Sequence, residues 1–305
     1  MLAVVVTHNG APWISECLES IAQQVYPGLD SIVVDSGSRV RAEATVTEVL
    51  PEAEYLRMEA NLGFGAAANR ALEVSAKASG AEYFLFLHDD VAMDPECVGR
   101  LVDAALETGA GVVGGKGVDW NDPEILVEVG MAADQFCYPF SGLETGEIDQ
   151  GQHDRRREAL FVTSACMLVS REMEERCGSW DGAYFAFGED LDLCLRGQLA
   201  GFRVVVSPGA RFRHAAAMAS QARDSEAARR IRFYTRRNRL RTIAKTTAAY
   251  RVWAVLFLNA LLVLGEVVLL AGLRRFEEIP AYPKAFGSFL RSLPEVIRRR
   301  RAVQK

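Results

Sequence analysis

The fold is decided by one stretch, Tyr83-Phe84-Leu85-Phe86-Leu87-His88-Asp89-Asp90-Val91. Five apolar residues lead directly into an imidazole and two carboxylates. A short apolar run of this length is typical of a strand buried on both faces, as in a parallel sheet under helices. Ligands of open α/β sheets bind outside the carboxyl ends of the strands. Oxygen ligands suit Mg²⁺ or Mn²⁺, ions that share their coordination with substrate phosphates. The alternative is an ordinary acidic turn before a helix that starts at Asp94-Pro95.

Strands and helices alternate through the first hundred residues. The sequence predicts strands at Leu2–Thr7, Ser31–Asp35, Glu54–Met58 and Tyr83–Leu87, and helices at Trp13–Gln24, Arg41–Leu50, Phe64–Ala78 and Pro95–Leu106. This alternation predicts a parallel, doubly wound sheet. Three of the strands end in polar clusters, which are Thr7-His8-Asn9-Gly10, Asp35-Ser36-Gly37-Ser38 and His88-Asp89-Asp90. Because all three clusters follow carboxyl ends, we expect them to meet in one crevice.

The alternation fails between Gly109 and Glu158, where glycines and polar residues indicate irregular strands and a loop. Regular structure is predicted again as strands at Ala159–Ser170 and Phe202–Ser207, a helix at Gly188–Ala200 and a short extended piece at Gly209–Arg213. We therefore expect one domain over residues 1–222, with halves 1–108 and 109–222, followed over 223–305 by a basic helical tail that contains an apolar segment at 252–273.

Charge separates the body from the tail. Residues 223–305 carry 19 Lys and Arg against 6 Asp and Glu, whereas residues 1–222 carry 16 against 34. The tail is thus +13 and the body −18, an asymmetry that points to a contact of the tail with a membrane or with nucleic acid. The body is too acidic to bind nucleic acid itself. The arginines of the tail flank an apolar segment, which makes a nucleic-acid role for the tail the weaker interpretation.

The apolar segment of the tail, residues 252–273, is long enough to cross a bilayer. Ten basic residues precede it from Arg223 to Arg251, and nine follow it from Arg274 to Lys305. The positive-inside rule would keep both flanks on the cytoplasmic side. A re-entrant or interfacial helix with basic flanks on anionic lipid therefore fits better than a single span. A buried helix that covers the sheet or forms a dimer is the remaining alternative.

The six cysteines are scattered, with no C-x-x-C pair and no histidine at zinc spacing. This distribution favours reduced thiols in a cytosolic setting over a disulfide framework or a zinc site.

The motifs in their order resemble those of family 2 inverting glycosyltransferases, and in particular the bacterial rhamnosyltransferase-like branch. The resemblance covers about residues 1–215 and rests on Val4–Asn9, Val33–Ser38, Asn61–Phe64 with Asn69, His88–Asp90, Gly178–Asp181 and Phe185–Asp192. It implies a GT-A fold, a nucleotide-diphosphate sugar donor and a divalent cation, Mg²⁺ or Mn²⁺. It also implies that 1–108 is the nucleotide-sugar-binding half and 109–222 the acceptor-binding half.

The resemblance assigns the donor side to the strand ends. It implies donor contacts for Thr7, Asn9, Asp35, Asn61, Gly63, Asn69, His88 and Asp89. Simple turn chemistry is the alternative for Thr7 and Asn9, and an Asx-turn is the alternative for Asp35. Gly63 would let the backbone approach the ligand, whereas Asn69 could equally be a helix residue that bonds this loop.

His88-Asp89-Asp90 takes the place of the family's D-x-D motif, with histidine at the first position. Asp90 is then the expected metal ligand, and Asp89 could take that part if the register is shifted. His88 could bind metal, contact the donor or orient the loop. His214 follows a strand at the position where relatives place a histidine that can contact metal or phosphate; an exposed histidine is the alternative.

Phe187-Gly188-Glu189-Asp190 is the expected catalytic turn. Inverting transfer needs a base for the acceptor hydroxyl and charge stabilisation for the leaving diphosphate. The resemblance makes Asp190 the base, with Glu189 shaping the acceptor site and Trp180 and Asp181 lining it. The alternative is that acids in a first helical turn are favoured by the macrodipole alone, which would also lower their pKa.

The sequence therefore predicts a membrane-associated inverting glycosyltransferase at the cytoplasmic face of the cell membrane, acting on a lipid-linked or polymeric cell-envelope acceptor; homo-oligomers are possible. One rival is a catalytically degenerate membrane scaffold or glycan-binding protein, although Asp35, Asp90 and Asp190 are all present. A sugar nucleotidyltransferase is a second rival. It would need a Gly-rich loop with Lys or Arg after the first strand, which Asn9-Gly10-Ala11-Pro12 lacks.

Overall fold

The computed structural model of the chain describes residues 1–216 and 225–304. The predicted boundary between residues 222 and 223 lies outside the described residues. The strands are β1 Leu2–Thr7, β2 Asp30–Ser36, β3 Glu54–Met58, β4 Tyr83–His88, β5 Val91–Met93, β6 Val112–Asp119, β7 Leu126–Glu128, β8 Ala132–Ala133, β9 Pro139–Phe140, β10 Arg157–Glu158, β11 Cys166–Ser170 and β12 Val204–His214. The helices are α1 Ile14–Ala22, α2 Glu43–Val49, α3 Phe64–Val74, α4 Cys97–Thr108, α5 Arg171–Cys177, α6 Glu189–Leu199, α8 Ser225–Thr246, α9 Val252–Gly272 and α10 Ala281–Val303, with a short 3₁₀ turn at Ala78–Gly80.

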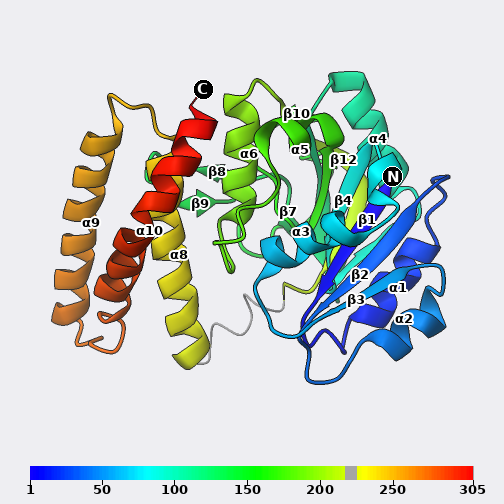
Figure 1. Cartoon of the computed structure of the whole chain (residues 1–305), viewed down its shortest axis with the longest axis horizontal. Coiled ribbons are helices and arrows are strands. Elements are labelled where there is room, and N and C mark those ends of the chain that lie inside the picture. Colours follow the sequence, from blue (N-terminus) through cyan, green and yellow to red (C-terminus); the bar gives the residue numbers. More distant parts are fainter. Residues whose placement is uncertain (217–224, 305) are drawn as a thin grey trace.

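The central sheet has the order β10-β12-β6-β11-β4-β1-β2-β3 (Figure 1). The four neighbouring strands β4-β1-β2-β3 of this sheet are parallel, as predicted. The pairing of β11 with both neighbours is antiparallel, so the sheet is mixed rather than purely parallel. Thr7 pairs with Asp35, and Val6 pairs with His88. The three polar strand ends therefore lie side by side at one edge, which confirms that part of the prediction.

Side chains of each central strand alternate between two cores, as the pleat of a strand requires. Leu85 and Leu87 of β4 pack with α1, α2 and α4 on one face. Phe84 and Phe86 pack with α3, α5 and α6 on the other face. Residues 84–87 are thus buried on both faces of the sheet, which is why all four are apolar.

Strands β12 and β11 differ from the prediction. β12 is one strand, interrupted by a register shift between Val206 and Arg211, where a strand and a separate extended piece were expected. Pro208 and Gly209 lie inside this irregularity, so the residues that suggested a break mark a bulge instead. β11 begins at Cys166 rather than at Ala159.

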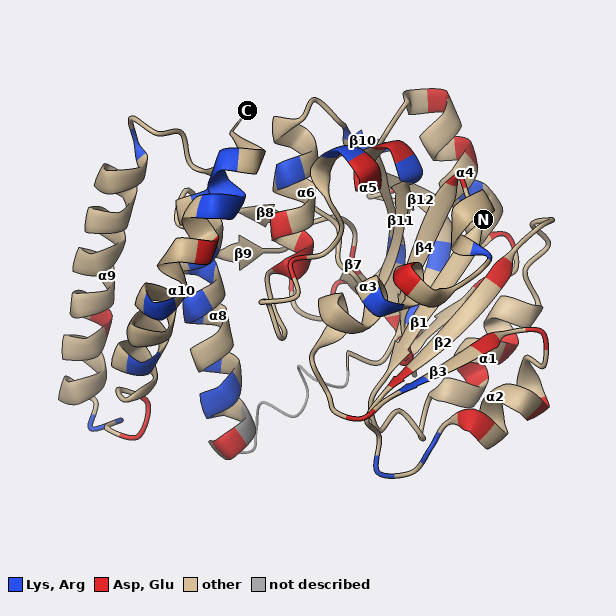
Figure 2. Cartoon of the chain, viewed as in Figure 1, with Lys and Arg blue, Asp and Glu red and all other residues tan. Residues whose placement is uncertain are grey.

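The tail forms a layer of three helices beside α6 (Figure 1). Ile243 of α8 and Val255 of α9 belong to the same hydrophobic cluster as Phe86 and Leu191. Figure 2 shows most of the acidic side chains on the body, whereas Lys and Arg predominate on α8 and α10. Basic helices are therefore packed directly against an acidic body.

Candidate functional site

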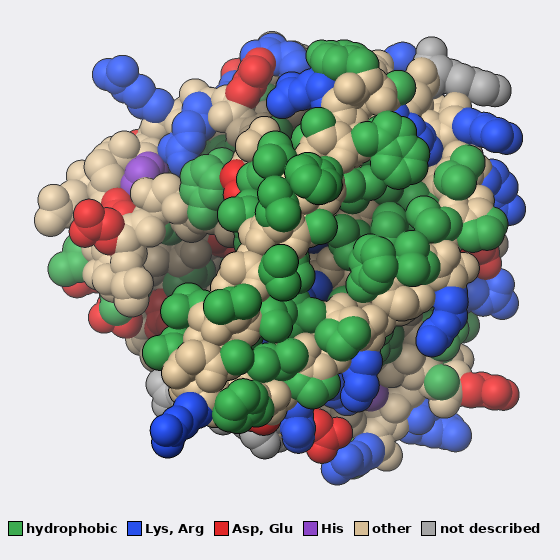
Figure 3. Space-filling model, turned by 90° about the vertical axis from the view of Figure 1, so that its left-hand side faces the viewer, with side chains coloured by type: hydrophobic (Ala, Val, Ile, Leu, Met, Phe, Trp, Pro, Cys, Tyr) green, Lys and Arg blue, Asp and Glu red, His purple; other side chains and the backbone are tan. Residues whose placement is uncertain are grey.

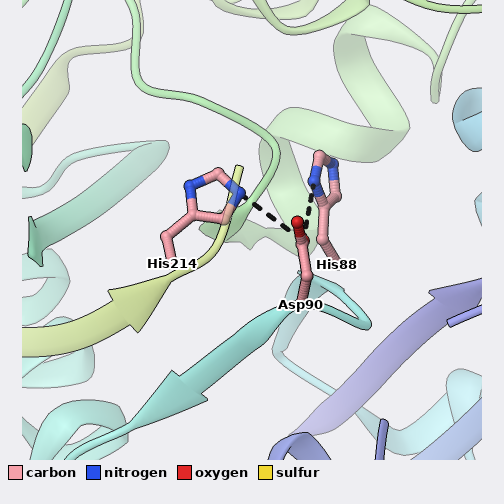
Figure 4. Close-up of side chains that lie close together, drawn as sticks. All are labelled: His88, Asp90 and His214. Atoms are coloured by element: carbon pink, nitrogen blue, oxygen red, sulfur yellow. Dashed lines mark ion pairs between the residues drawn. The ribbon is translucent and has the colours of Figure 1, made fainter. Parts of the chain in front are cut away.

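Three side chains converge where β4 ends, at the predicted strand edge (Figure 4). Asp90 lies in the turn after β4, and His214 is the last residue of β12. The Oδ1 atom of Asp90 is 3.5 Å from His214 Nε2 and 3.9 Å from His88 Nδ1. The three potential ligand atoms all lie within 4.8 Å of one another. Two imidazoles and one carboxylate can therefore face a single ion.

The surroundings give the two histidines opposite protonation. Burial lowers the pKa of His88 to about 4, so its ring is neutral near pH 7. Burial also acts against protonation of His214, but Asp90 and Glu128 raise its pKa to about 10. Glu128, at the end of β7, places its Oε2 atom 3.6 Å from His214 Nδ1. In the absence of an ion, the His214 imidazolium thus provides the positive charge between the two carboxylates.

Asp89 faces away from this group and toward the end of β1. Its Oδ2 atom accepts a hydrogen bond from the backbone N–H of His8 at 3.1 Å, and the carboxyl also bonds the side chain of Thr7. Burial raises the pKa of Asp89 to about 7. Asp89 therefore ties the β4 loop to the β1 loop, and Asp90 is the carboxylate that meets the histidines.

Asp35 is fully buried at the end of β2. Oδ1 accepts from the Ser38 N–H at 2.8 Å; Oδ2 accepts from the Tyr55 hydroxyl at 3.0 Å and from the Arg57 guanidinium at 2.6 Å. Burial opposes ionisation, but hydrogen bonds led by Ser38 lower the pKa of Asp35. Asp35 thus fixes the Asp35–Ser38 turn from inside. The prediction that it contacts a donor stays a prediction.

Asn9 joins the first two strand-end loops. It has the left-handed φ of 60°, which asparagine tolerates better than most residues. Its N–H donates to Ser38 Oγ at 2.9 Å, and its Oδ1 accepts from the Arg39 N–H at 2.8 Å. These bonds align the two loops that would face a nucleotide.

The loop before α3 lies against the turn that precedes α6, where catalysis was predicted. Asn61 Oδ1 accepts from the Gly63 N–H at 2.9 Å. Gly63 has φ of +89°, and a Cβ there would lie 2.1 Å from the carbonyl oxygen of Phe185, so glycine is required for this close approach. Further along α3, Asn69 bonds both the N–H and the C=O of Trp180, at 3.1 and 2.9 Å. The loop predicted to face the donor and the segment predicted to face the acceptor are therefore fixed to each other.

Glu189 and Asp190 open α6, with Glu189 buried. Burial raises the pKa of both carboxyls, and the charge of Asp190 raises that of Glu189 further. The lowering of these pKa values by the helix dipole, which belonged to the alternative interpretation, is outweighed by burial. Ser164, before β11, bonds the carboxyl of Glu189 through its side chain and the carboxyl of Asp190 through its backbone. Its hydroxyl also lies 3.0 Å from Nε2 of His88, so Ser164 connects the acids with the metal-ligand group.

The backbone before Glu189 and Asp190 adopts left-handed dihedral angles and is held by hydrogen bonds from α8. Phe187 has φ of 66° and Gly188 has φ of 87°, and a bulky residue in this left-handed region costs energy. Asn238 of α8 is buried and donates from Nδ2 to the carbonyls of Ala186 at 2.8 Å and of Phe187 at 2.7 Å. The tail thus helps to hold the predicted catalytic turn in place.

Trp180 and Asp181 are both buried behind this turn. The ring of Trp180 packs edge-on against Phe64 and Phe86. The Asp181 carboxylate is 2.7 Å from Lys245 Nζ. Burial acts to raise the pKa of Asp181, but Lys245 and neighbouring arginines lower it to about 2. Both residues are therefore packed inside the protein, and their contact with an acceptor stays a prediction.

Sequence reasoning missed Glu128, Ser164 and Asn238. Glu128 comes from the region where the strand–helix alternation fails, and Ser164 from a segment expected to be an uninterrupted strand. Asn238 is the one uncharged polar side chain among the neighbouring Arg236, Arg237 and Arg239 of the basic tail. An asparagine between arginines is a weak signal by itself.

Comparison with known proteins places the chain among sugar transferases. Residues 2–178 match the sequence profile described as Glycosyl transferase family 2. The chain is 30% identical over 204 residues to the O-antigen biosynthesis protein RfbC of Myxococcus xanthus, across 64% of this chain and 15% of that protein. It is 25% identical over 230 residues to the N-acetylglucosaminyl-diphospho-decaprenol L-rhamnosyltransferase of Mycobacterium tuberculosis, across 69% of this chain and 74% of that protein. The chain therefore spans only a small part of the Myxococcus protein.

Two solved structures share the fold. One is the structure of GalNAc-T7 with UDP, GalNAc and Mn²⁺, with a TM-score of 0.58 and 15% identity, across 70% of this chain and 42% of that one. The other is a mannosyltransferase from Pyrobaculum calidifontis in complex with GDP-Man and Mn²⁺, with a TM-score of 0.55 and 17% identity, across 96% of this chain and 74% of that one. These likenesses confirm the GT-A architecture predicted from the motifs.

Proposed function

The chain belongs to glycosyl transferase family 2, and from this premise we propose that it transfers a sugar from a nucleotide-diphosphate donor to a hydroxyl, with inversion at the anomeric carbon. The proposed acceptor is a lipid-linked or polymeric cell-envelope glycan, reached from the cytoplasmic face of the membrane. L-Rhamnose is the first sugar to test, because it is the sugar in the name of the Mycobacterium relative.

One observation carries this proposal. Ser164 contacts His88 of the potential metal-ligand group and both carboxyls of the α6 turn. A group suited to a cation beside a diphosphate is therefore joined through one residue, Ser164, to two carboxyls with raised pKa values. This juxtaposition is what transfer requires, since one side must stabilise a leaving diphosphate and the other must accept a proton.

Asp190 is the proposed general base. The pKa of Glu189 is raised further than that of Asp190, so near pH 7 Glu189 holds a proton while Asp190 is ionised. Two neighbouring carboxyls whose environments separate their pKa values can take different roles. Asp190 accepts the proton of the acceptor hydroxyl as its oxygen bonds to the anomeric carbon and the bond to the diphosphate oxygen breaks. Protonated Glu189 donates a hydrogen bond on the acceptor side.

The donor set of the metal-ligand group fits a divalent cation. His88, Asp90 and His214 offer two nitrogens and one oxygen, all within 4.8 Å of one another. Imidazole ligands suit transition metals, whereas Mg²⁺ prefers an all-oxygen shell, so we propose Mn²⁺ rather than Mg²⁺. When bound, the cation supplies charge stabilisation to the diphosphate.

We assign residues to the donor side or the acceptor side from the loops that surround the potential metal ligands and the α6 turn. Thr7, Asn9 and Asp35 shape the strand-end loops toward the nucleotide, together with Asn61, Gly63, Asn69 and Asp89. Trp180 and Asp181 shape the acceptor side from behind. Residues 1–222 are proposed as the catalytic domain and 223–305 as the tail that keeps it at the membrane.

Donor binding tests the proposal. Detergent-purified protein would be screened by thermal shift against uridine, thymidine and guanosine diphosphate sugars, first with Mn²⁺ and then with EDTA. We expect one class of donor to raise the melting temperature only when Mn²⁺ is present. A protein that responds to no donor, with a lipid-linked acceptor either present or absent, would support the scaffold alternative.

A further inference from the structure

The strongest surface feature outside the site is an apolar face made by α9 and α10 (Figure 3). We call it the α9–α10 face. On α9 it contains Trp253, Phe257, Leu261, Leu264, Val268 and Leu269, each at least half exposed. Phe286, Leu290 and Ile297 extend it along α10. A contiguous exposed patch of this kind on a folded chain marks an interaction site.

The polar residues of α9 face the opposite way. Asn259 is buried and accepts a hydrogen bond from Arg239 of α8 at 2.9 Å. Glu266 accepts from Arg236 of α8 at 2.7 Å. The two residues that interrupt the apolar segment are therefore bonded to α8, and the outer surface of α9 is left apolar.

Charge identifies what covers this face. Between residues 251 and 301 the exposed basic side chains are Arg251, Arg274, Arg275, Lys284, Arg291, Arg298 and Arg301, whereas Glu277 is the exposed acid. Figure 3 shows basic side chains around the edge of the apolar area. An apolar surface with a basic rim is complementary to an anionic bilayer, whose headgroups attract the rim while the acyl chains receive the apolar side chains.

The packing of α9 against α8 also bears on whether α9 crosses the bilayer or lies on its surface. At 21 residues α9 is roughly 31 Å long, enough to cross by length. However, α8 runs beside α9, fixed to it by Arg236 and Arg239, and α10 runs beside α8, where Arg241 contacts Glu295. If α9 crossed the bilayer, these charged residues would enter the hydrocarbon with it, which is costly. We propose that the α9–α10 face lies flat in one leaflet of an anionic membrane and that α9 does not span it.

This inference specifies the geometry of the membrane association proposed above. It does not depend on sugar transfer, because the experiment below measures only lipid binding and depth. If it fails, the donor-binding test is unaffected.

The first arm measures binding to vesicles of phosphatidylcholine alone and of equimolar phosphatidylcholine and phosphatidylglycerol, by flotation. We expect binding to the anionic vesicles, weakened at high salt. The double substitution Phe257→Glu with Leu264→Glu should reduce this binding at least about tenfold. Leu106→Glu, at an exposed leucine on α4, is the matched control and should bind as wild type. Circular dichroism would establish that all three proteins are folded.

The second arm measures depth. Tryptophan would be placed at Leu261 or Val268 in a Trp253→Phe background, and its quenching by lipids brominated at different depths compared with that of Trp253. A helix lying flat gives the same shallow depth at all three positions. A depth that is greatest in the middle of α9 would overturn the proposal in favour of a span. Equal binding of wild type and the double variant, or dimerisation through this face without lipid binding, would overturn it as well.

Discussion

The chemistry of the site depends on how individual side chains are buried. Burial raises the pKa of both Glu189 and Asp190, but the charge of Asp190 raises that of Glu189 further, whereas the backbone N–H of Leu191 lowers that of Asp190. His88 and His214 are likewise opposite in protonation although both face Asp90. Residue type alone would not separate either pair, because the differences come from the groups that surround each side chain.

The base assignment predicts a steep loss of transfer in Asp190→Asn. The amide cannot accept the proton of the acceptor hydroxyl, so kcat should fall by a factor of about 10² to 10⁴. The fall would be measured as initial rates at saturating donor. Asp103→Ala, at an exposed carboxylate on α4, should keep the wild-type rate. Transfer at a wild-type rate by Asp190→Asn would remove Asp190 from the role of base.

The pH dependence follows from the same carboxyl. Burial raises the pKa of Asp190 to about 6, and a base works only when it is ionised. Activity should therefore be present above about pH 6 and be lost as the pH falls through that value, rather than near pH 4 as for an ordinary aspartate. A profile of kcat against pH measures this inflection. Full activity maintained at pH 4.5 would contradict the assignment.

His214 makes metal binding depend on pH. Its pKa is raised to about 10 because the imidazolium lies between Asp90 and Glu128. A metal ion must displace that proton, so Mn²⁺ affinity should increase as the pH rises from 6 to 8. Binding can be followed by the paramagnetic relaxation of water. Glu128→Gln should flatten the dependence, and an affinity independent of pH in the wild type would contradict this account.

At the scale of elements, α8 connects the tail to the catalytic turn. Asn238 bonds the carbonyls of Ala186 and Phe187, and Lys245 is buried between Asp181 and Asp192, with Nζ–O distances of 2.7 and 2.6 Å. Asn238 thus positions the turn before α6, and Lys245, at the C-terminal end of α8, anchors α6 itself.

Asn238 is accordingly a positioning residue. Asn238→Ala would release two carbonyls next to the left-handed Phe187, and small displacements of catalytic groups can cost about a hundredfold in rate. We expect kcat to fall about 10- to 100-fold with KM for the donor unchanged. Asn259→Ala removes another buried asparagine from the tail and should leave kcat unchanged. Parallel losses in both variants would mean that Asn238 only stabilises the fold.

Lys245 is expected to matter for stability. Lys245→Ala would leave two buried carboxylates without their shared cation, which costs about 3–5 kcal/mol when a buried pair is broken. Urea unfolding in detergent would measure the change in the free energy of unfolding. Lys284→Ala, at an exposed position, should change it by less than about 0.5 kcal/mol. A similar small effect for Lys245→Ala would show that α8 is not anchored there.

The sequence predicted the central elements well and the later ones less well, for physical reasons. β1 to β4 were predictable because strands buried on both faces are almost purely apolar. The tail was predicted to be helical, but the bounds of α10 were not, because prolines such as Pro283 and Pro294 normally mark helix boundaries. In the structure Pro283 lies near the helix start, and α10 packs against α8. The site residues within the first hundred positions of the chain could be predicted from sequence motifs. The placement of Glu128 and Ser164 in the site instead depends on contacts between segments that are distant in the sequence.

At the scale of the whole molecule, one edge of a sheet gathers the candidate metal ligands and the α6 turn, and a basic helical layer supports that turn from the other side. The outer surface of this layer is apolar (Figure 3), whereas most of the acidic side chains lie on the body (Figure 2). The central claim is that Asp90 acts on the donor side through a cation while Asp190 acts on the acceptor side.

Calorimetric titration of the identified donor into Asp90→Ala and Asp190→Asn, each with Mn²⁺, tests this claim most directly. We predict that Asp190→Asn binds the donor as wild type does, and that Asp90→Ala binds at least about tenfold more weakly because it loses the charged contact to the cation. Wild-type affinity in Asp90→Ala, or loss of donor binding in Asp190→Asn, would contradict the division of the site into a donor side and an acceptor side.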